Sequence, residues 1–279
     1  MTDALLPLPH AVDTRTCSGE VHDQGAQVTR WVPTGADPVL YVSTAVKLEA
    51  GAAIRGGIPV CWPWFGPGRA PGMTPAHGFV RTATWDLVER VDADEAVTFT
   101  HRITSETATS PHWPHSYSLE LRSRFGRRLE IALTSTNTGD APVDLEEALH
   151  AYLVVGDIRQ VTLDGLDGKA FFDKVAGTER RQSGPVGFTG ETDAVFRTSE
   201  SVTVVDPVLG RRLVVSTDGA SNVVVWNPWG EKAADVADIG DDDWLRFVCV
   251  EGANVFENAV ELARGESRTM AYTIDVEDL

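Results

Sequence analysis

The sequence predicts an all-β protein, organised as a large antiparallel β-sandwich. Apolar and polar residues alternate with a period of two in many short segments, which is typical of strands with one buried face. No amphipathic stretch with convincing helical periodicity is evident. The 25 glycines and 15 prolines are spread along the chain, as turns between many strands require. A barrel or a jelly roll fits the same alternation and is the alternative architecture.

Individual strands are predicted where the alternation is longest. The clearest segments are 97–100, 119–122, 129–134 and 270–276. Phe125-Gly126-Arg127 separates two of these segments and predicts a hairpin turn between them. A second hairpin is predicted from 202–205 and 213–215, because a turn containing Pro207 and Gly210 joins them.

The chain is expected to form one domain over residues 1–279. It has no low-complexity linker, no abrupt change of composition and no internal repeat of fixed period. Large all-β folds often reach this length as single domains, so length alone does not imply two. We expect a monomer that acts on a small molecule.

The net charge limits the classes of partner. The formal charge is −17 at pH 7 and no basic stripe is present, so neither nucleic acid nor an anionic membrane surface is expected as a partner. No apolar run approaches the roughly 20 residues of a membrane-spanning helix. Residues 1–10 lack the features of a secretory signal, which favours a cytoplasmic location. Exposed charges are screened beyond about 8 Å, so a few local arginines can still bind an anion.

No metal or cofactor is expected. Cys17, Cys61 and Cys249 form neither a disulfide framework nor a zinc pattern, and the last two are expected to be buried as small apolar residues. His112-Trp113-Pro114-His115 has a ligand-like spacing but no carboxylate nearby, and Asp241-Asp242-Asp243 predicts a solvated acidic loop. Phosphate-binding loops and dinucleotide fingerprints are missing from the sequence.

Three segments far apart in the chain carry residue types that proton transfer needs, namely His77, His150 and Glu251. His150 and Glu251 lie within runs that otherwise predict buried strands. Burying a bare carboxylate costs several kcal/mol, so Glu251 must be paired, hydrogen-bonded or shifted in pKa. An acid–base pair in a strand-built cleft is the first hypothesis. For either residue alone, a hydrogen-bonded polar group in the core is the alternative.

Two arginines suggest an anion site. Arg55 precedes Gly56-Gly57, and its planar donor fork suits phosphate or carboxylate. His77 and Arg81 are four residues apart, and in an extended segment both side chains would point to the same side. Arg55 and Arg81 together therefore predict that one pocket binds an anion.

Aromatic side chains between residues 53 and 67 have two interpretations. Trp62, Trp64 and Phe65 can form an apolar platform for a sugar ring, or they can belong to a rigid loop that caps a sheet edge. The composition of this segment is equally consistent with both interpretations. The loop predicted at 226–232 supplies further aromatic and polar groups, and a carboxylate at a predicted strand entrance, Asp193, can accept hydroxyl hydrogen bonds from a sugar.

Taken together, these segments resemble the aldose 1-epimerase superfamily, and within it the branch that acts on hexose 6-phosphates. The resemblance spans residues 20–276 and rests on motifs that follow the family's order: 54–60, 77–81, 149–152, 191–193, 226–232 and 248–251. It implies a β-sandwich of the galactose mutarotase-like type, with a cleft on a concave sheet and no cofactor.

The resemblance also implies a catalytic pair. Glu251 matches the family's general base and His150 its general acid, and we expect them to face each other across the width of one pyranose ring. The implied reaction is the interconversion of the α and β anomers of a hexose 6-phosphate, with glucose 6-phosphate as the expected substrate. Each group would act as acid in one direction and as base in the other.

Further residues match substrate-binding positions of the family. His77 matches a histidine that holds the sugar, Arg55 and Arg81 match arginines that bind the phosphate, and Asp193 matches a hydroxyl-binding aspartate. One position departs from the pattern, because Ala76 stands where the branch commonly has glutamine. This change removes a side-chain hydrogen bond near the sugar.

Other functions remain to be distinguished. The nearest is a mutarotase for unphosphorylated aldoses, which differs in whether the arginines face the ligand. A non-catalytic sugar-phosphate-binding protein on the same fold is disfavoured because binding alone does not require a proton-transfer pair. A glycosidase is disfavoured because only one strand-borne carboxylate stands out, whereas that chemistry uses two.

Overall fold

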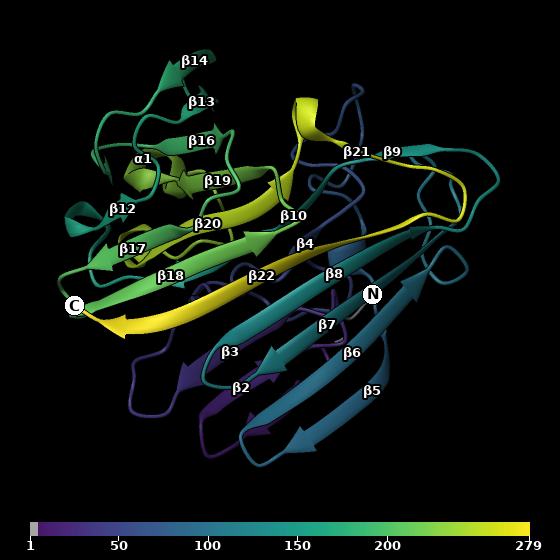
Figure 1. Ribbon diagram of the computed structural model, residues 1–279, viewed down its shortest axis with the longest axis horizontal. Coiled ribbons are helices and arrows are strands. Elements are labelled where there is room, and N and C mark those ends of the chain that lie inside the picture. The colour runs from purple at the N-terminus through teal and green to yellow at the C-terminus, as the bar shows by residue number, and fades with distance from the viewer. Residues whose placement is uncertain (1–4) are drawn as a thin grey trace.

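The computed structural model describes residues 5–279, and two large antiparallel sheets dominate it (Figure 1). The larger sheet has nine strands. In sheet order they are β15 (Val186–Gly187), β12 (Thr162–Asp164), β17 (Val202–Asp206), β18 (Arg211–Asp218), β22 (Ser267–Asp278), β8 (Leu129–Asn137), β7 (Tyr117–Phe125), β6 (Ala96–Thr104) and β5 (Asp86–Ala93).

The second large sheet has eight strands, and two small sheets flank the pair. The order in the second sheet is β14 (Thr178–Arg181), β13 (Ala170–Asp173), β16 (Thr192–Phe196), β19 (Asn222–Asn227), β20 (Phe247–Asn254), β10 (Glu147–Leu149) and β4 (Val60–Cys61), with β11 (Tyr152–Val154) also paired to β20. The small sheets are β1 (His10–Asp13), β2 (Cys17–Val21) and β3 (Val28–Pro33), and β9 (Val143–Leu145) with β21 (Val260–Leu262).

The two large sheets pack face to face around one apolar core. Val248 and Val250 of β20 belong to the same buried cluster as Leu119 of β7 and Leu133 of β8. The hydroxyl of Tyr272 in β22 donates to the Val250 carbonyl at 2.6 Å, so a hydrogen bond also links the sheets. The predicted all-β sandwich is therefore confirmed.

Sequence alternation corresponds closely to burial in the nine-stranded sheet. Every second residue of β8 is buried, as predicted for a strand with one face in the core. The predicted hairpins are β7–β8 and β17–β18, and the predicted final strand lies within β22. By contrast, all residues of β20 are buried, because both of its faces are covered.

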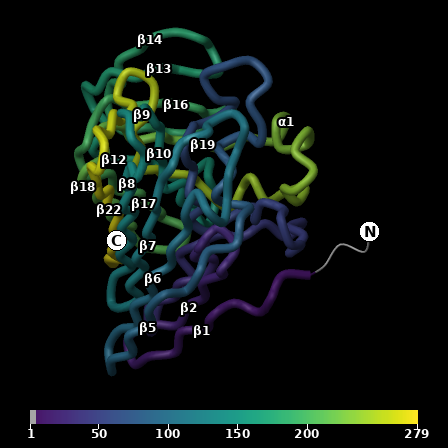
Figure 2. The backbone as a smooth tube through the Cα atoms, turned by 90° about the vertical axis from the view of Figure 1, so that its right-hand side faces the viewer, coloured from purple at the N-terminus to yellow at the C-terminus, as the bar shows by residue number. Residues whose placement is uncertain are grey.

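Helical structure is scarce, as predicted. The α-helix α1 (Trp229–Ala234) is short, and the 3-10 segments are η1 (Val80–Thr82), η2 (Ile158–Gln160), η3 (Asp243–Arg246) and η4 (Phe256–Asn258). Within residues 5–279, no helix has the length and apolar character needed to cross a membrane. Figure 2 shows β1, β2 and β6 at one end of the molecule and β13, β14 and β16 at the other.

Candidate active site

Three neighbouring strands of the eight-stranded sheet present polar groups on the face away from the core. Because successive residues of a strand alternate between faces, Val250 packs into the core and Glu251 points the opposite way. Val224 of β19 is paired with Glu251, and Trp226, two residues on, is paired with Asp193 of β16. The register therefore brings residues from three distant segments onto one surface.

His150 reaches the same surface from the short link between β10 and β11. Both strands pair with β20, with Leu149 opposite Gly252 and Tyr152 opposite Cys249. This register fixes the link beside Glu251. The strand predicted through residue 150 is thus interrupted there. The interruption directs the imidazole of His150 toward a pocket.

The pocket encloses about 140 Å³. Its lining consists of two histidines, two carboxylates, two cations, two aromatic side chains and one valine: His77, His150, Asp193, Glu251, Arg55, Lys174, Phe65, Trp226 and Val224. Most of these groups are polar, with apolar surfaces from the two aromatic rings. Such a lining suits a small polyhydroxylated ligand that carries negative charge.

His150 and Glu251 are in direct contact within this pocket. The Nε2 atom of His150 lies 3.3 Å from Oε1 of Glu251, and the two residues are only 6% and 1% exposed. The predicted gap of one pyranose width between them is wrong. Both groups lie on one wall, side by side, because strand pairing sets their backbones next to each other.

The environment of His150 favours its neutral form. Burial lowers the pKa of His150 well below its ordinary value, and the nearby His77, Arg81 and Arg55 lower this pKa further. Its Nδ1 atom is buried without a hydrogen-bond partner in the described part of the chain. The ring therefore has the capacity for one more polar contact on the side away from Glu251.

The environment of Glu251 also favours the neutral form. Burial raises the pKa of Glu251 well above its ordinary value, and Asp193 raises it further, whereas Lys174 and Arg81 lower it. The second carboxyl oxygen, Oε2, is buried and has no partner among the described residues. A buried, incompletely satisfied carboxyl group beside an imidazole is typical of sites that transfer protons.

Arg55 is anchored on two sides. Its guanidinium lies 3.0 Å from Oδ1 of Asp238 and donates to the hydroxyl of Tyr152 at 3.0 Å. The backbone that follows requires glycine, since Gly57 has φ of 63° and a Cβ atom there would lie 2.2 Å from the Val28 carbonyl oxygen. This constrained turn directs Arg55 into the pocket.

A second cation enters from the turn after β13. Lys174 pairs with Asp193, with 2.7 Å between Nζ and Oδ2, and its ammonium lies 5.5 Å from the centre of the Phe65 ring. The Lys174 backbone N–H also donates to the Asp193 carbonyl. Lysine and aspartate are therefore fixed together in the same pocket as His150 and Glu251, where they can bind phosphate or hydroxyl groups.

Comparisons with known proteins agree with this chemistry. The sequence profile of the family described as aldose 1-epimerase matches residues 11–275. The chain belongs to the aldose 1-epimerase family. A protein of Escherichia coli named "putative glucose-6-phosphate 1-epimerase" is 38% identical over 237 residues, which cover 84% of this chain and 79% of the relative. A protein from Cenchrus ciliaris with the same name is 33% identical, over 90% of this chain and 79% of the relative.

Solved structures share the architecture of this chain. The crystal structure titled as a "putative mutarotase" from Salmonella typhimurium superposes with a TM-score of 0.90 at 34% identity, covering 96% of this chain and 90% of that one. A galactose mutarotase-like protein from Lactobacillus casei reaches a TM-score of 0.73 at 15% identity, with 96% and 100% of the two chains covered. The fold is therefore the predicted galactose mutarotase-like type.

Five of the six predicted site residues line this pocket: Arg55, His77, His150, Asp193 and Glu251. The Nδ1 atom of His77 accepts a hydrogen bond from the Gly66 N–H, at 3.4 Å. Burial lowers the pKa of His77 to about 3, so this ring is neutral at physiological pH. Because Nδ1 accepts this hydrogen bond, the neutral ring carries its proton on Nε2 and can donate one hydrogen bond to a sugar hydroxyl.

Arg81, the sixth predicted residue, lies beside the pocket and is not part of its lining. The extended segment predicted for 77–81 is wrong, since His77 has φ of 66° and Val80–Thr82 forms the 3-10 turn η1. The Nε atom of Arg81 is buried without a partner among the described residues. Its charge nevertheless lowers the pKa values of His77 and His150, which places it close to the site.

The aromatic platform was only partly predicted. Trp62 and Trp64 are each 1% exposed and belong to the main apolar core, so their assignment to a sugar platform is wrong. Phe65 from the same segment does line the pocket, and Trp226 of β19 lines it too. The tryptophans of this segment fill the core, which neither interpretation predicted, and only Phe65 is placed where it can contact a sugar ring.

The acidic run at 241–243 is not simply solvated. Asp243 is buried and accepts hydrogen bonds from the hydroxyls of Tyr41, at 2.6 Å, and Ser43, at 3.1 Å. Its neighbours Asp241 and Asp242 are exposed, as predicted. Asp243 therefore fixes the chain between α1 and β20. Cys61 and Cys249 are buried free thiols, as predicted.

Three residues near the site were missed from the sequence, Lys174, Asp238 and Glu146. Glu146 is buried, and its two carboxyl oxygens accept the backbone N–H groups of Phe65, at 3.0 Å, and Phe256, at 2.9 Å. Glu146 therefore fixes the position of Phe65, whose ring lines the pocket. A single lysine or acid outside any motif gives no spacing signal, so only the fold identifies these residues.

Proposed function

We propose that this aldose 1-epimerase interconverts the α and β anomers of a hexose 6-phosphate, with glucose 6-phosphate as its substrate. The observation that carries the proposal is the 3.3 Å contact between His150 and Glu251 in a pocket that also contains Arg55 and Lys174. An acid–base pair accounts for the ring opening, and the cations account for a phosphorylated substrate. The names of the Escherichia coli and Cenchrus ciliaris relatives support the same substrate.

The reaction needs one proton removed and one supplied at neighbouring atoms. Glu251 accepts the proton of the anomeric hydroxyl while His150 donates one to the ring oxygen, and the C1–O5 bond breaks to give the open-chain aldehyde. Rotation about C1–C2 exposes the other carbonyl face, and the ring closes with both proton transfers reversed. Because the two oxygens share one carbon, adjacent groups on a single wall can serve both.

The phosphate of the substrate can also favour protonation of His150, the proposed acid. His150 must carry a proton to act as the acid, yet burial and the positive charges of Arg55 and Arg81 lower its pKa. A phosphate group brings a charge of about −1.5 to −2 at neutral pH. Placed near Arg55, this charge offsets the positive charge that disfavours the imidazolium. A proton then moves more easily from the Glu251 carboxyl to His150 across their contact.

The remaining pocket residues have proposed binding roles. Arg55, Arg81 and Lys174 bind the phosphate, while Asp193 and His77 hold sugar hydroxyls. Phe65 and Trp226 supply apolar surfaces for the sugar ring. The family profile extends over residues 11–275, which supports one domain over residues 1–279, and the proposed form of the protein is a monomer.

Exchange spectroscopy by NMR tests the proposal directly. Addition of the protein to glucose 6-phosphate should produce exchange between the α and β anomeric signals beyond the buffer rate. The double variant Glu251→Gln/His150→Asn should return exchange to that rate. Faster exchange with glucose than with glucose 6-phosphate would show a mutarotase for unphosphorylated aldoses. Ligand binding without exchange would show a non-catalytic binding protein.

The phosphate preference has its own test. Arg81→Ala should slow exchange of glucose 6-phosphate much more than exchange of glucose, whose rate can change only through the effect of Arg81 on the pKa of His150. Arg159→Ala is the matched control, since Arg159 is an exposed arginine paired with Asp157. Equal losses on both sugars in Arg81→Ala would contradict the proposed role of Arg81 in phosphate binding.

A further inference from the structure

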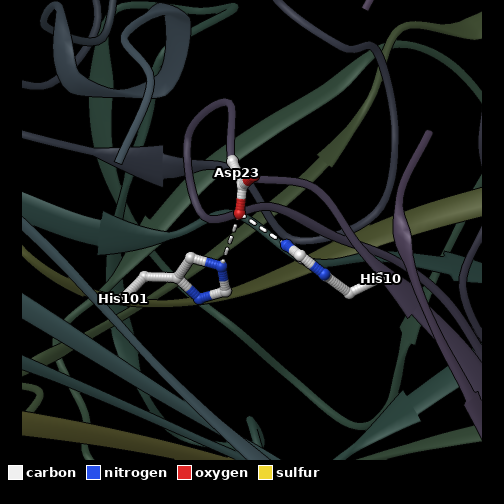
Figure 3. A group of neighbouring side chains, drawn as sticks. All are labelled: His10, Asp23 and His101. Atoms are coloured by element: carbon white, nitrogen blue, oxygen red, sulfur yellow. Dashed lines mark hydrogen bonds and ion pairs between the residues drawn. The ribbon is translucent and has the colours of Figure 1, made fainter. Parts of the chain in front are cut away.

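Two imidazoles and one carboxylate converge outside the pocket. His10 comes from β1, Asp23 from the bend between β2 and β3, and His101 from β6. The Nε2 atoms of His10 and His101 lie 2.7 Å and 3.2 Å from the same oxygen, Oδ1 of Asp23. Figure 3 shows both rings turned toward this oxygen. None of the three residues lines the pocket that contains Glu251.

The donor set and its geometry suit a transition metal. Imidazole nitrogen with carboxylate oxygen is a typical ligand combination for zinc, whereas magnesium and calcium prefer oxygen alone. The three donor atoms lie within 4.8 Å of one another. Zinc binds such donors at about 2.0–2.2 Å, so small side-chain movements suffice to surround one ion.

The surroundings leave the ligands available. The His101 side chain is fully buried, whereas those of His10 and Asp23 are 30% and 35% exposed. An ion held here would therefore contact solvent on one side, where water can complete its coordination.

We propose that His10, Asp23 and His101 bind one divalent first-row transition-metal ion, with zinc as the ion that fits best. The ion connects strand β1 of the three-stranded sheet to strand β6 of the nine-stranded sheet. Since 78 residues separate Asp23 from His101, binding closes a long loop of the chain. The site stabilises the packing of the N-terminal sheet and takes no part in the sugar chemistry.

Titration of the metal-free protein with zinc tests the site. Isothermal titration calorimetry should show one ion per chain, with magnesium giving no binding. At zinc concentrations about 100-fold above the dissociation constant, Tm should rise by about 5 °C. Cobalt in place of zinc should give a visible absorption spectrum that reports nitrogen and oxygen ligands.

Variants distinguish this site from other histidines. His10→Asn and Asp23→Asn should each weaken zinc binding at least tenfold; both alter partly exposed side chains, so the fold should persist. The double variants His150→Asn/Glu251→Gln and His112→Asn/His115→Asn should bind zinc like the wild type. No saturable binding, or binding lost in either double variant but retained in His10→Asn, would overturn the proposal.

Discussion

The ring of Tyr152 lies parallel to the imidazole of His150, with ring centroids 4.8 Å apart and 12° between their planes. The hydroxyl of the same tyrosine accepts a hydrogen bond from Arg55 at 3.0 Å. One side chain therefore contacts both the proposed acid and a proposed phosphate ligand. Its ring orients His150 by stacking, while its hydroxyl positions the guanidinium.

Tyr152→Phe should separate these two functions. The variant keeps the stacking ring and loses the hydrogen bond to Arg55, so KM for glucose 6-phosphate should rise roughly fivefold while kcat stays within about twofold. Tyr152→Leu also removes the stacked ring and should lower kcat. Initial rates from anomer-resolved NMR provide both constants. A fall in kcat in Tyr152→Phe equal to that in Tyr152→Leu would contradict the separation.

Loss of either member of the proton-transfer pair should abolish most of the activity. Glu251→Gln and His150→Asn should each slow exchange about 10²–10⁴-fold, because each removes one proton-transfer group. The double variant should be little slower than the worse single variant, since the two groups act as a unit. Additive losses in the double variant would indicate that Glu251 and His150 act independently.

Glu251→Gln should stabilise the fold at neutral pH. Burial raises the pKa of Glu251 above its ordinary 4.5, so the folded protein retains a proton that the unfolded chain releases. The stability from this group is complete below pH 4.5 and is lost as pH rises through the raised pKa. Glutamine does not ionise, so the variant escapes this loss.

Thermal unfolding at two pH values measures the effect. We expect Tm of Glu251→Gln to exceed that of the wild type by at least about 2 °C at neutral pH. The difference should shrink below pH 4.5, where both proteins are neutral at this position. Glu95→Gln, at an exposed glutamate, should show no such gain. A variant less stable than the wild type at neutral pH would refute this explanation.

Asp238→Asn should strengthen binding of the phosphorylated sugar. Asp238 pairs with Arg55 in the free protein and thus competes with phosphate for the guanidinium. Exposed pairs contribute up to about 1 kcal/mol, so KM for glucose 6-phosphate should fall by no more than about fivefold. Glucose should be unaffected. Asp241→Asn, a nearby exposed aspartate, serves as control, and an equal fall there would indicate a general charge effect.

Gly57→Ala should destabilise the protein and disturb the Arg55 turn. A side chain at φ of 63° is strained, and its Cβ atom would meet the Val28 carbonyl oxygen at 2.2 Å, so we expect a loss of at least about 2 kcal/mol in the free energy of unfolding. Gly51→Ala is the matched control, with a similar φ of 80° and no atom within 4 Å. Urea denaturation compares the two.

The sequence predicted those features that local patterns determine. Alternation identified β7 and β8 because one face of each strand is buried, and the two hairpins followed from their turns. Glu251 and His150 were identifiable because polar residues inside apolar runs require an explanation. The resemblance to a family then supplied the pairing between segments that are far apart in the chain.

Other features depend on three-dimensional context. Trp62 and Trp64 fill the core, although their sequence also suits a sugar platform, because burial of an aromatic ring leaves no local pattern. Lys174 enters the pocket only through the pairing of β13 with β16. His10, Asp23 and His101 share no motif and meet because β1, β6 and the bend between β2 and β3 converge. Sequence spacing reports none of these contacts.

Glu251 lies at the centre of β20, a strand that is buried along its whole length. The residues proposed to transfer protons therefore come from different elements than the residues proposed to select the substrate. Arg55, Lys174 and Asp238 come instead from turns at the rim. Loops can be exchanged without dismantling the sheet beneath them, as insertions at surface connections are well tolerated. Directed evolution toward other sugars should therefore succeed by diversifying these turns, while His150 and Glu251 are kept unchanged.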